Sequence, residues 1–177
     1  MDADRLFREY HGTLVRYLTR RLGDRDWAEE VAQETFVRAL RQDAIASERS
    51  WLFAVASNLV RDEARRVARQ RQHLQLLAAE EREREAATAP EDAEEMTPER
   101  ARNAACARKA LDSLGERDRQ ALLLKAEGLN YDEIADVLEI EKTSVGTTLS
   151  RARRRLAESY DALRQPAQAG GEGHVAS

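Results

Sequence analysis

The chain has 177 residues, and its 33 Asp and Glu residues outnumber its 29 Lys and Arg residues, which gives a formal charge of -4 and an isoelectric point near 5.6. A mean hydropathy of -0.70 and the lack of an apolar run of about 18 residues exclude a membrane-spanning helix. A net acidic chain also lacks the overall charge that is typical of a nucleic-acid binder. Only 8 Gly and 3 Pro accompany abundant Ala, Leu, Arg and Glu, which favours an all-α fold. The N-terminus lacks the apolar centre of a signal peptide, so we expect a soluble protein of the cytoplasm.

The residue types of common catalytic and metal sites are scattered along the chain. The three histidines lie at positions 11, 73 and 174, and Cys106 is the single cysteine. The sequence has no glycine-rich phosphate loop after a strand and no Gly-x-Ser-x-Gly motif. Its carboxylates fall on polar helix faces rather than in pairs that could converge in a cleft. We therefore expect no enzymatic activity, no cofactor and no metal site.

The first 71 residues predict three helices that share one small core. The first covers about residues 4–22, where apolar residues recur every three or four positions. Asp26 is the expected N-cap of the second helix, with Glu29 at the capping-box position, and its apolar stripe consists of Trp27, Val31, Phe36 and Leu40. A polar loop over residues 42–50 precedes a third helix over 51–71, whose inward face is expected to hold Leu52, Val55 and Leu59.

Residues 72–103 predict an acidic linker. Nine acids and two arginines lie between positions 80 and 99, a net charge of -7, and Pro90 and Pro98 are expected to interrupt any helix there. The expected organisation is therefore two small helical domains, 1–71 and 104–163, joined by a flexible linker over 72–103 and followed by a disordered tail over 164–177.

The second domain begins with two predicted helices, over 101–114 and 116–127, the latter ended by Gly128. A helical hairpin follows over 129–156. Asn130 and Glu133 stand at the positions of a capping box, Thr143 or Ser144 is the expected cap of the second helix, and the apolar stripe of that helix comprises Val145, Leu149, Ala152 and Leu156.

This hairpin has the pattern of a helix-turn-helix. Residues 142–156 contain five basic residues and no acid, with Arg151, Arg153, Arg154 and Arg155 in the C-terminal half. A basic second helix is typical of one that enters the DNA major groove. Many helical hairpins carry a basic end only for solubility, so the segment favours DNA binding without settling it.

The third helix has a second basic stripe, formed by Asn58, Arg61, Arg65, Arg66 and Arg69. One interpretation is an exposed flank that charge keeps soluble. The other is a nucleic-acid track, because Arg neutralises phosphates and Asn can bind base edges. Trp51 and Phe53 begin the same helix and could stack on unpaired bases, although a core position for Trp51 is equally consistent with the pattern.

The second helix is acidic on its exposed sides, where Asp26, Glu29, Glu30 and Glu34 lie. Acids near a helix N-terminus interact favourably with the helix dipole, which is the simpler interpretation. The alternative is a docking surface for a basic partner helix, with Gln33 supplying directional hydrogen bonds.

Taken together and in this order, the motifs resemble the sigma factors of bacterial RNA polymerase, specifically the small extracytoplasmic-function (ECF) group of the sigma-70 family. Residues 28–36, Ala-Glu-Glu-Val-Ala-Gln-Glu-Thr-Phe, are similar to the family's polymerase-docking helix. Residues 51–66 are similar to its helix for the -10 promoter element, and residues 111–124 with the hairpin are similar to its -35-binding domain. The likeness covers about residues 4–71 and 104–160.

The resemblance implies an all-α fold and partners that composition does not reveal: core RNA polymerase, through the β′ clamp helices and the β subunit, promoter DNA, and an anti-sigma factor as a candidate. It implies that core polymerase is bound by Glu29, Glu30, Gln33 and Glu34. It implies that the -10 element is captured as single-stranded DNA by Trp51, Asn58, Arg61, Arg65 and Arg66. It implies that the -35 duplex is bound by Lys142, Thr143, Ser144, Thr147, Thr148, Arg151, Arg153 and Arg154.

Three positions depart from the family pattern. Glu139 stands where Gly is usual in the turn, and a positive φ there carries a strain of about 1 kcal/mol. Gly115 replaces the usual Pro before the preceding helix. Gly146, Thr147 and Thr148 stand where Lys-Ser-Arg is frequent, which bears on base-specific contacts rather than on the phosphate-binding arginines.

The sequence thus predicts a sigma factor that brings RNA polymerase to promoters and helps to open them. The alternative is a stand-alone helix-turn-helix regulator, and a third class is a protein-binding helical adaptor. Residues 26–36 distinguish the first two, because a simple regulator has no use for a polymerase-docking helix.

Overall fold

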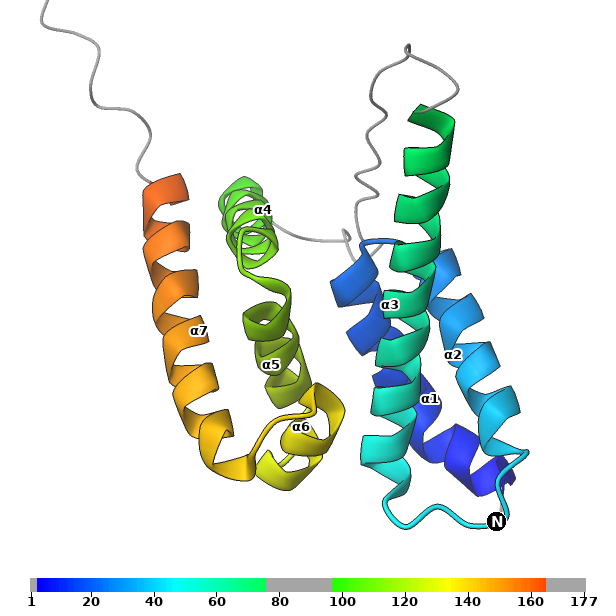
Figure 1. Ribbon diagram of the computed structural model, residues 1–177. Helices are drawn as coiled ribbons and strands as arrows, with labels where there is room; N and C mark the ends of the chain where they lie inside the picture. The colour runs from blue at the N-terminus through cyan, green and yellow to red at the C-terminus, as the bar shows by residue number, and fades with distance from the viewer. Residues whose placement is uncertain (1–2, 76–96, 165–177) are drawn as a thin grey trace, which may run out of the picture.

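The computed structural model describes residues 3–75 and 97–164. These ranges form seven α-helices in two units that lie side by side (Figure 1). The N-terminal unit contains α1 (Ala3–Leu22), α2 (Arg25–Ala39) and α3 (Glu48–Gln75). The C-terminal unit contains α4 (Pro98–Asp112), α5 (Glu116–Ala126), α6 (Tyr131–Leu138) and α7 (Lys142–Arg164). The all-α fold with two helical units is confirmed.

The apolar core runs through both units. Leu14 and Leu18 of α1 and Phe53 of α3 are completely buried in the N-terminal unit, as are Leu124 and Ile134 in the C-terminal unit. The two sets belong to one continuous cluster, because α6 packs on α3 and α5 packs on α1. None of the helices in the described ranges combines the length and hydrophobicity that a bilayer span requires.

Several predicted helix starts are wrong. Asp24 rather than Asp26 caps α2, and its side chain accepts a hydrogen bond from the Trp27 backbone N–H at 3.0 Å. Pro98 begins α4 instead of interrupting it, with Thr97 as N-cap, because the first helical position needs no backbone N–H donor. The helix α3 begins at Glu48, inside the predicted loop over residues 42–50, and extends to Gln75, beyond the predicted end at residue 71.

The inward face of α3 differs from the prediction as well. Val55 and Leu59 are only half-buried, and the buried residues of α3 among those whose burial is described are Ser50, Leu52, Phe53, Ala56, Ser57 and Val60. Phe53 is 0% exposed and its ring centroid lies 5.1 Å from that of Tyr17, so this aromatic cannot stack on a DNA base. At the end of α2, Leu40 is 62% exposed, against its expected place in the core.

The predicted ends of the helix-turn-helix are mostly confirmed. Asn130 and Glu133 form both hydrogen bonds of a capping box, at 2.9 and 2.8 Å. Glu139 has φ 54°, the left-handed conformation expected for this turn, and Gly128 follows α5 with φ 81°. The helix α7 begins at Lys142, before either Thr143 or Ser144, so neither of them is its cap.

Candidate DNA- and polymerase-binding surfaces

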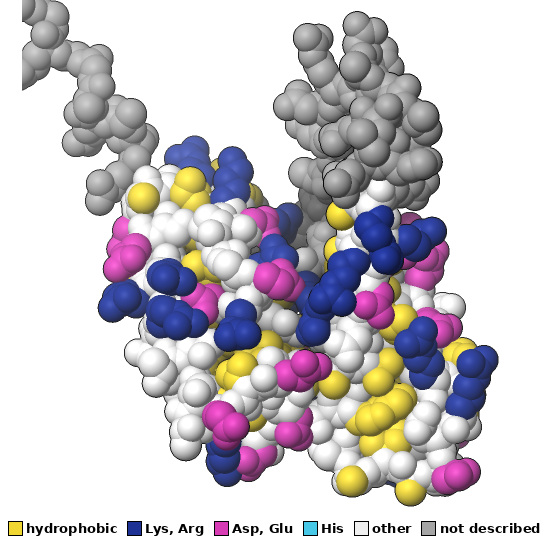
Figure 2. Space-filling model, in the orientation of Figure 1, with side chains coloured by type: hydrophobic (Ala, Val, Ile, Leu, Met, Phe, Trp, Pro, Cys, Tyr) yellow, Lys and Arg dark blue, Asp and Glu magenta, His cyan; other side chains and the backbone are white. Residues whose placement is uncertain are grey.

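The outer side of α7 presents most of the polar residues expected to contact DNA. The hydrophobic stripe of Val145, Leu149 and Ala152 is buried and orients the helix. The exposed residues are Lys142, Thr143, Ser144, Thr147, Ser150, Arg153, Arg154 and Arg155. Thr148 is 6% exposed because it lies on the inward side of the helix, so it does not belong to this surface. Figure 2 shows Lys and Arg side chains gathered over α7.

Two arginines of α7 are held by one buried carboxylate. The side chain of Asp118 in α5 is 4% exposed and accepts hydrogen bonds from Arg151 at 2.7 Å and from Arg155 at 2.8 Å. The Arg151 hydrogen bond, followed by its charge and by the contact with Arg155, holds the pKa of Asp118 below its ordinary value despite burial. Arg151 and Arg155 therefore have fixed positions on α7, whereas Arg153 extends from its exposed side.

The start of α6 lies against the start of α7. A Cβ placed on Gly146 would lie 3.7 Å from the Tyr131 ring, an ordinary van der Waals contact, so an alanine there would fit without displacing the ring. Tyr131 is 41% exposed, and Lys125 lies 5.4 Å from its centroid. Lys142 forms an ion pair with Asp132 at 2.6 Å. These contacts connect the two helices of the hairpin at the end that faces solvent.

The polar stripe of α3 extends away from the core. Asn58, Arg65 and Arg66 are exposed, and Arg61 and Trp51 are half-buried. Arg66 binds Glu63 through two hydrogen bonds of 2.8 and 2.6 Å, and Arg65 lies 3.7 Å from Asp62. In Figure 2, basic side chains gather along the upper part of α3 and hydrophobic ones along its lower part. The stripe thus combines cations with an apolar surface on a single helix.

The acidic residues of α2 form a second exposed surface. Glu30, Gln33 and Glu34 are exposed, and Glu34 accepts a hydrogen bond from Arg38 at 2.7 Å. Glu29 is half-buried and lies 3.2 Å from His11 of α1. The exposed Val37 continues the same side of the helix toward Leu40. The result is a mixed acidic and apolar surface on the side of α2 that faces solvent.

The sequence pattern does not single out the buried polar residues in and directly after α5. An acid in the first turn of a helix is usually explained by its favourable interaction with the helix dipole, so Asp118 gave no sign of a further role. Gln120 and Glu127 are also buried, at 4% and 7% exposed, although their residue types are typical of surfaces. Their spacing could have indicated burial, because Gln120 and Glu127 lie on the same helix face as the apolar Leu124. Across residues 3–75 and 97–164, no group of three or more His, Cys, Asp or Glu side chains could hold a metal ion.

Each of the two units matches a known protein-family model. Residues 6–70 match the family model "Sigma-70 region 2", and residues 104–156 match "Sigma-70, region 4". The chain is 30% identical to the ferric citrate uptake sigma factor FecI of Escherichia coli K12 over 86% of this chain and 87% of FecI. It is 27% identical to the RNA polymerase sigma factor YlaC of Bacillus subtilis 168, over 90% of this chain and 92% of YlaC.

A solved structure shares the fold. The sigma factor RpoE of Bartonella quintana, crystallised with the anti-sigma factor NepR, superposes with a TM-score of 0.69 at 22% identity, over 90% of this chain and 97% of RpoE. The chain therefore belongs to the sigma-70 family of RNA polymerase sigma factors, within its extracytoplasmic-function group. It is a transcription initiation factor that binds core RNA polymerase and promoter DNA and directs the polymerase to promoters.

We predict that Asp118→Asn destabilises the protein by about 1–3 kcal/mol at neutral pH, because the amide cannot accept both arginines of α7. The folded-state pKa of Asp118 is lowered, so its stabilisation is present above the unfolded-state pKa of about 3.9 and is lost as pH falls through the folded-state pKa. The stability difference between parent and variant should therefore narrow below about pH 4. Urea unfolding of both proteins over a pH series measures this difference in unfolding free energy.

The exposed Asp136 of α6 provides a matched control. Asp136→Asn should change the unfolding free energy by less than about 0.5 kcal/mol. If Asp118→Asn is as stable as the parent at pH 7, the ion pairs of Asp118 with Arg151 and Arg155 do not contribute to the unfolding free energy.

Proposed function

We propose that three surfaces divide the work of this sigma factor: α2 binds core polymerase, α3 captures the -10 element, and α7 binds the -35 duplex. The observation that carries the proposal is that the polar residues of each surface lie on a separate helix and are mostly exposed. The corresponding domains are a region 2-like domain over residues 1–71, with α3 continuing to Gln75, and a region 4-like domain over 104–163. The acidic linker over 72–103 and the tail over 164–177 lie mostly outside the described residues.

The polymerase surface consists of Glu30, Gln33 and Glu34, with Glu29 at its edge. Carboxylates on a helix flanked by the apolar Val37 fit a basic, amphipathic partner helix. We assign the β′ clamp helices to this surface. The protein acts without catalysis of its own, in the cytoplasm where RNA polymerase works, and an anti-sigma factor is a further proposed partner, as RpoE has in its crystal structure.

For the -10 element, we assign Asn58, Arg61, Arg65 and Arg66 to the single-stranded DNA, with Trp51 at the lower end. Arginines bind the phosphates, and the exposed Asn58 amide can bind an unpaired base edge. Trp51 is only half-buried, so part of its ring is available for stacking. The buried Phe53 takes no part.

For the -35 element, we assign Lys142, Thr143, Ser144, Thr147, Arg153 and Arg154 to direct contact. Thr147 and its neighbours at the front of α7 are the base-reading positions, and the arginines further along bind phosphates. Arg151 is committed to Asp118, so we assign it a smaller share of the DNA contact.

We predict that Glu34→Lys weakens binding to core polymerase at least about tenfold, because it reverses a charge at the centre of the acidic surface. Asp43→Lys makes the same charge change in the exposed loop after α2 and should leave the affinity nearly unchanged. Fluorescence anisotropy of labelled chain against core polymerase measures both. Equal affinities for parent and Glu34→Lys would remove α2 from the proposal.

We predict that Asn58→Ala impairs promoter opening about tenfold while closed-complex formation stays within about twofold, because an unpaired base is presented only after melting. Permanganate footprinting measures opening, and gel shift measures the closed complex. Asn103→Ala in α4 is the control and should affect neither. Equal losses in both steps would count against a role in binding the single strand.

On the -35 side, Arg153→Ala should weaken binding to all duplex sequences alike and reduce the salt slope by about one. Thr147→Ala should instead change the preference among -35 sequences, because a side chain at the front of the helix faces base edges. Titrating a panel of duplexes at several salt concentrations separates the two. A change in preference caused by Arg153→Ala would show that it reads bases.

A further inference from the structure

The front of α7, which we define as residues 142–150, carries hydroxyl groups rather than guanidinium groups. Its exposed side chains are those of Lys142, Thr143, Ser144, Thr147 and Ser150. Val145, Thr148 and Leu149 are buried, and Gly146 has no side chain. The surface that the start of this helix offers to DNA therefore consists of hydroxyl groups, threonine methyl groups and one ammonium group. Glu141, which precedes the helix, is exposed and adds only an acceptor.

The lysines near this front have partners within the protein. Lys142 forms an ion pair of 2.6 Å with Asp132, and Lys125 of α5 lies 5.4 Å from the centroid of the Tyr131 ring. The Lys142 pair is exposed to solvent, so it is weak, and the ammonium group remains a mobile point charge. A charge of this kind suits a phosphate group better than the two fixed acceptors of a guanine.

The arginines of α7 lie behind this front. Arg151 is bound to the buried Asp118 at 2.7 Å, and moving it to a base would leave that carboxylate with Arg155 alone. Arg154 lies on the same helix face as Thr143 but about 17 Å further along the axis, which exceeds the roughly 12 Å width of the major groove. Because the N-terminal residues of such a helix contact the base edges, we place these arginines over phosphates.

Guanine and thymine present different groups in the major groove. Guanine presents two acceptors, N7 and O6, which a bidentate donor such as arginine binds best, whereas thymine presents its C5 methyl group, which a threonine methyl group contacts. Thr143 and Thr147 lie four residues apart on one face of α7. The Tyr131 ring, 41% exposed, adjoins this front beside Gly146. Residues 142–150 thus offer apolar contacts to a thymine methyl group and no guanidinium group to a guanine.

We propose that the front of α7 reads thymine methyl groups in an A·T-rich -35 element, with Thr147 as the main contact, and does not require guanine. This inference rests on the proposed assignment of α7 to the -35 duplex and adds the class of base that it reads. One buried methyl group changes affinity about fourfold. A bidentate arginine–guanine contact changes it about 5- to 150-fold. The specificity for the -35 element is therefore spread over several modest contacts.

The first test changes the DNA. Holoenzyme reconstituted from the full-length chain and core polymerase selects promoter fragments from a randomised library, and the recurring upstream element is then modified. Each thymine is replaced by deoxyuridine, which lacks the C5 methyl group, and each guanine by 7-deazaguanine, which lacks N7. By gel shift, we expect deoxyuridine to weaken binding about fourfold at contacted positions. We expect 7-deazaguanine to change the affinity less than about twofold.

A double-mutant cycle connects the methyl effect to Thr147, which is exposed, so that its replacement does not disturb the core. Thr147→Ser keeps the hydroxyl group and removes the methyl group, and it should bind the thymine and deoxyuridine duplexes equally at the contacted position. Thr147→Val keeps the methyl group and should retain the fourfold difference. Thr97→Ser makes the same chemical change at the N-cap of α4 and should alter neither affinity.

A gain of guanine recognition is the converse test. Thr147→Arg places a bidentate donor at the front of α7 and should create a preference of about tenfold for guanine at one base pair, which 7-deazaguanine removes. Ala157→Arg places the same side chain at an exposed position further along α7 and should raise the affinity for all duplexes alike. Circular dichroism verifies that every variant is folded.

The outcomes separate this inference from the proposed function. If 7-deazaguanine weakens binding of the parent holoenzyme at least about tenfold, or deoxyuridine weakens it at no position, thymine reading is overturned while α7 keeps its assignment. A Thr147→Ser variant that still distinguishes thymine from deoxyuridine would remove Thr147 as the contact. If the parent holoenzyme selects promoters that share no upstream element, the proposed function of α7 is overturned, and this inference with it.

Discussion

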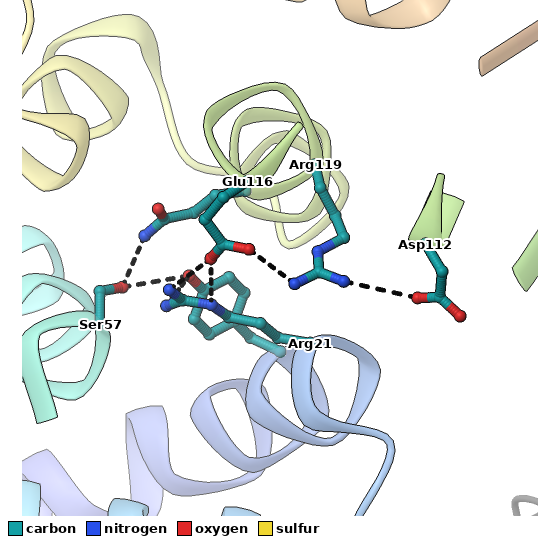
Figure 3. Close-up of polar contacts among 7 residues, drawn as sticks. Arg21, Ser57, Asp112, Glu116 and Arg119 are labelled. Carbon is teal, nitrogen blue, oxygen red and sulfur yellow. Dashed lines mark hydrogen bonds and ion pairs between the residues drawn. The ribbon is translucent and has the colours of Figure 1, made fainter. Parts of the chain in front are cut away.

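The helix α5 connects the two units of the fold. It packs against α6 and α7 within its own unit and against α1 of the N-terminal unit, and its Gln120 amide donates a hydrogen bond to Ser57 of α3 (Figure 3). Both contacts use carboxylates, Asp118 toward α7 and Glu127 toward α1. A buried carboxylate without partners costs several kcal/mol, about 3–5 when a pair is broken, so each site requires its arginines. Satisfying these charges adds to the apolar contacts that orient α7 on α5 and that pack α6 on α3 across the two units.

Asp118 and Glu127 have different consequences because their partners lie in different places. Asp118 binds two residues of a helix that is packed on α5 by Val145, Leu149 and Ala152, so its ion pairs support an apolar contact. Glu127 binds residues that belong to a separate unit in sequence, and the connection between the two units runs through residues 76–96. The first interaction lies within the C-terminal unit, whereas the second lies between the two units, beside the apolar packing of α6 on α3.

Charge segregation also explains how an acidic chain can bind DNA. The net charge of -4 describes the whole sequence, but the local field at α7 and at the upper part of α3 is set by the basic residues gathered there. Arg16, Arg20 and Arg21 of α1 instead lie against carboxylates of the C-terminal unit, so they do not add to these two basic surfaces.

Helical periodicity, capping residues such as Asn130 and charge clusters are local properties of the chain, so the helices, their order and the polar surfaces could be predicted from the sequence alone. The family resemblance marked Glu139 as a position where Gly is usual, and the structure gives it the left-handed conformation, with φ 54°. Burial at positions where the local pattern is ambiguous depends on the tertiary structure alone. Phe53, Thr148, Asp118 and Glu127 occupy positions whose local patterns are compatible with exposure, and their burial depends on helices distant in sequence. The contact between the units belongs to the same category, because nothing local to α5 specifies that Glu127 will meet Arg16 and Arg20 of α1.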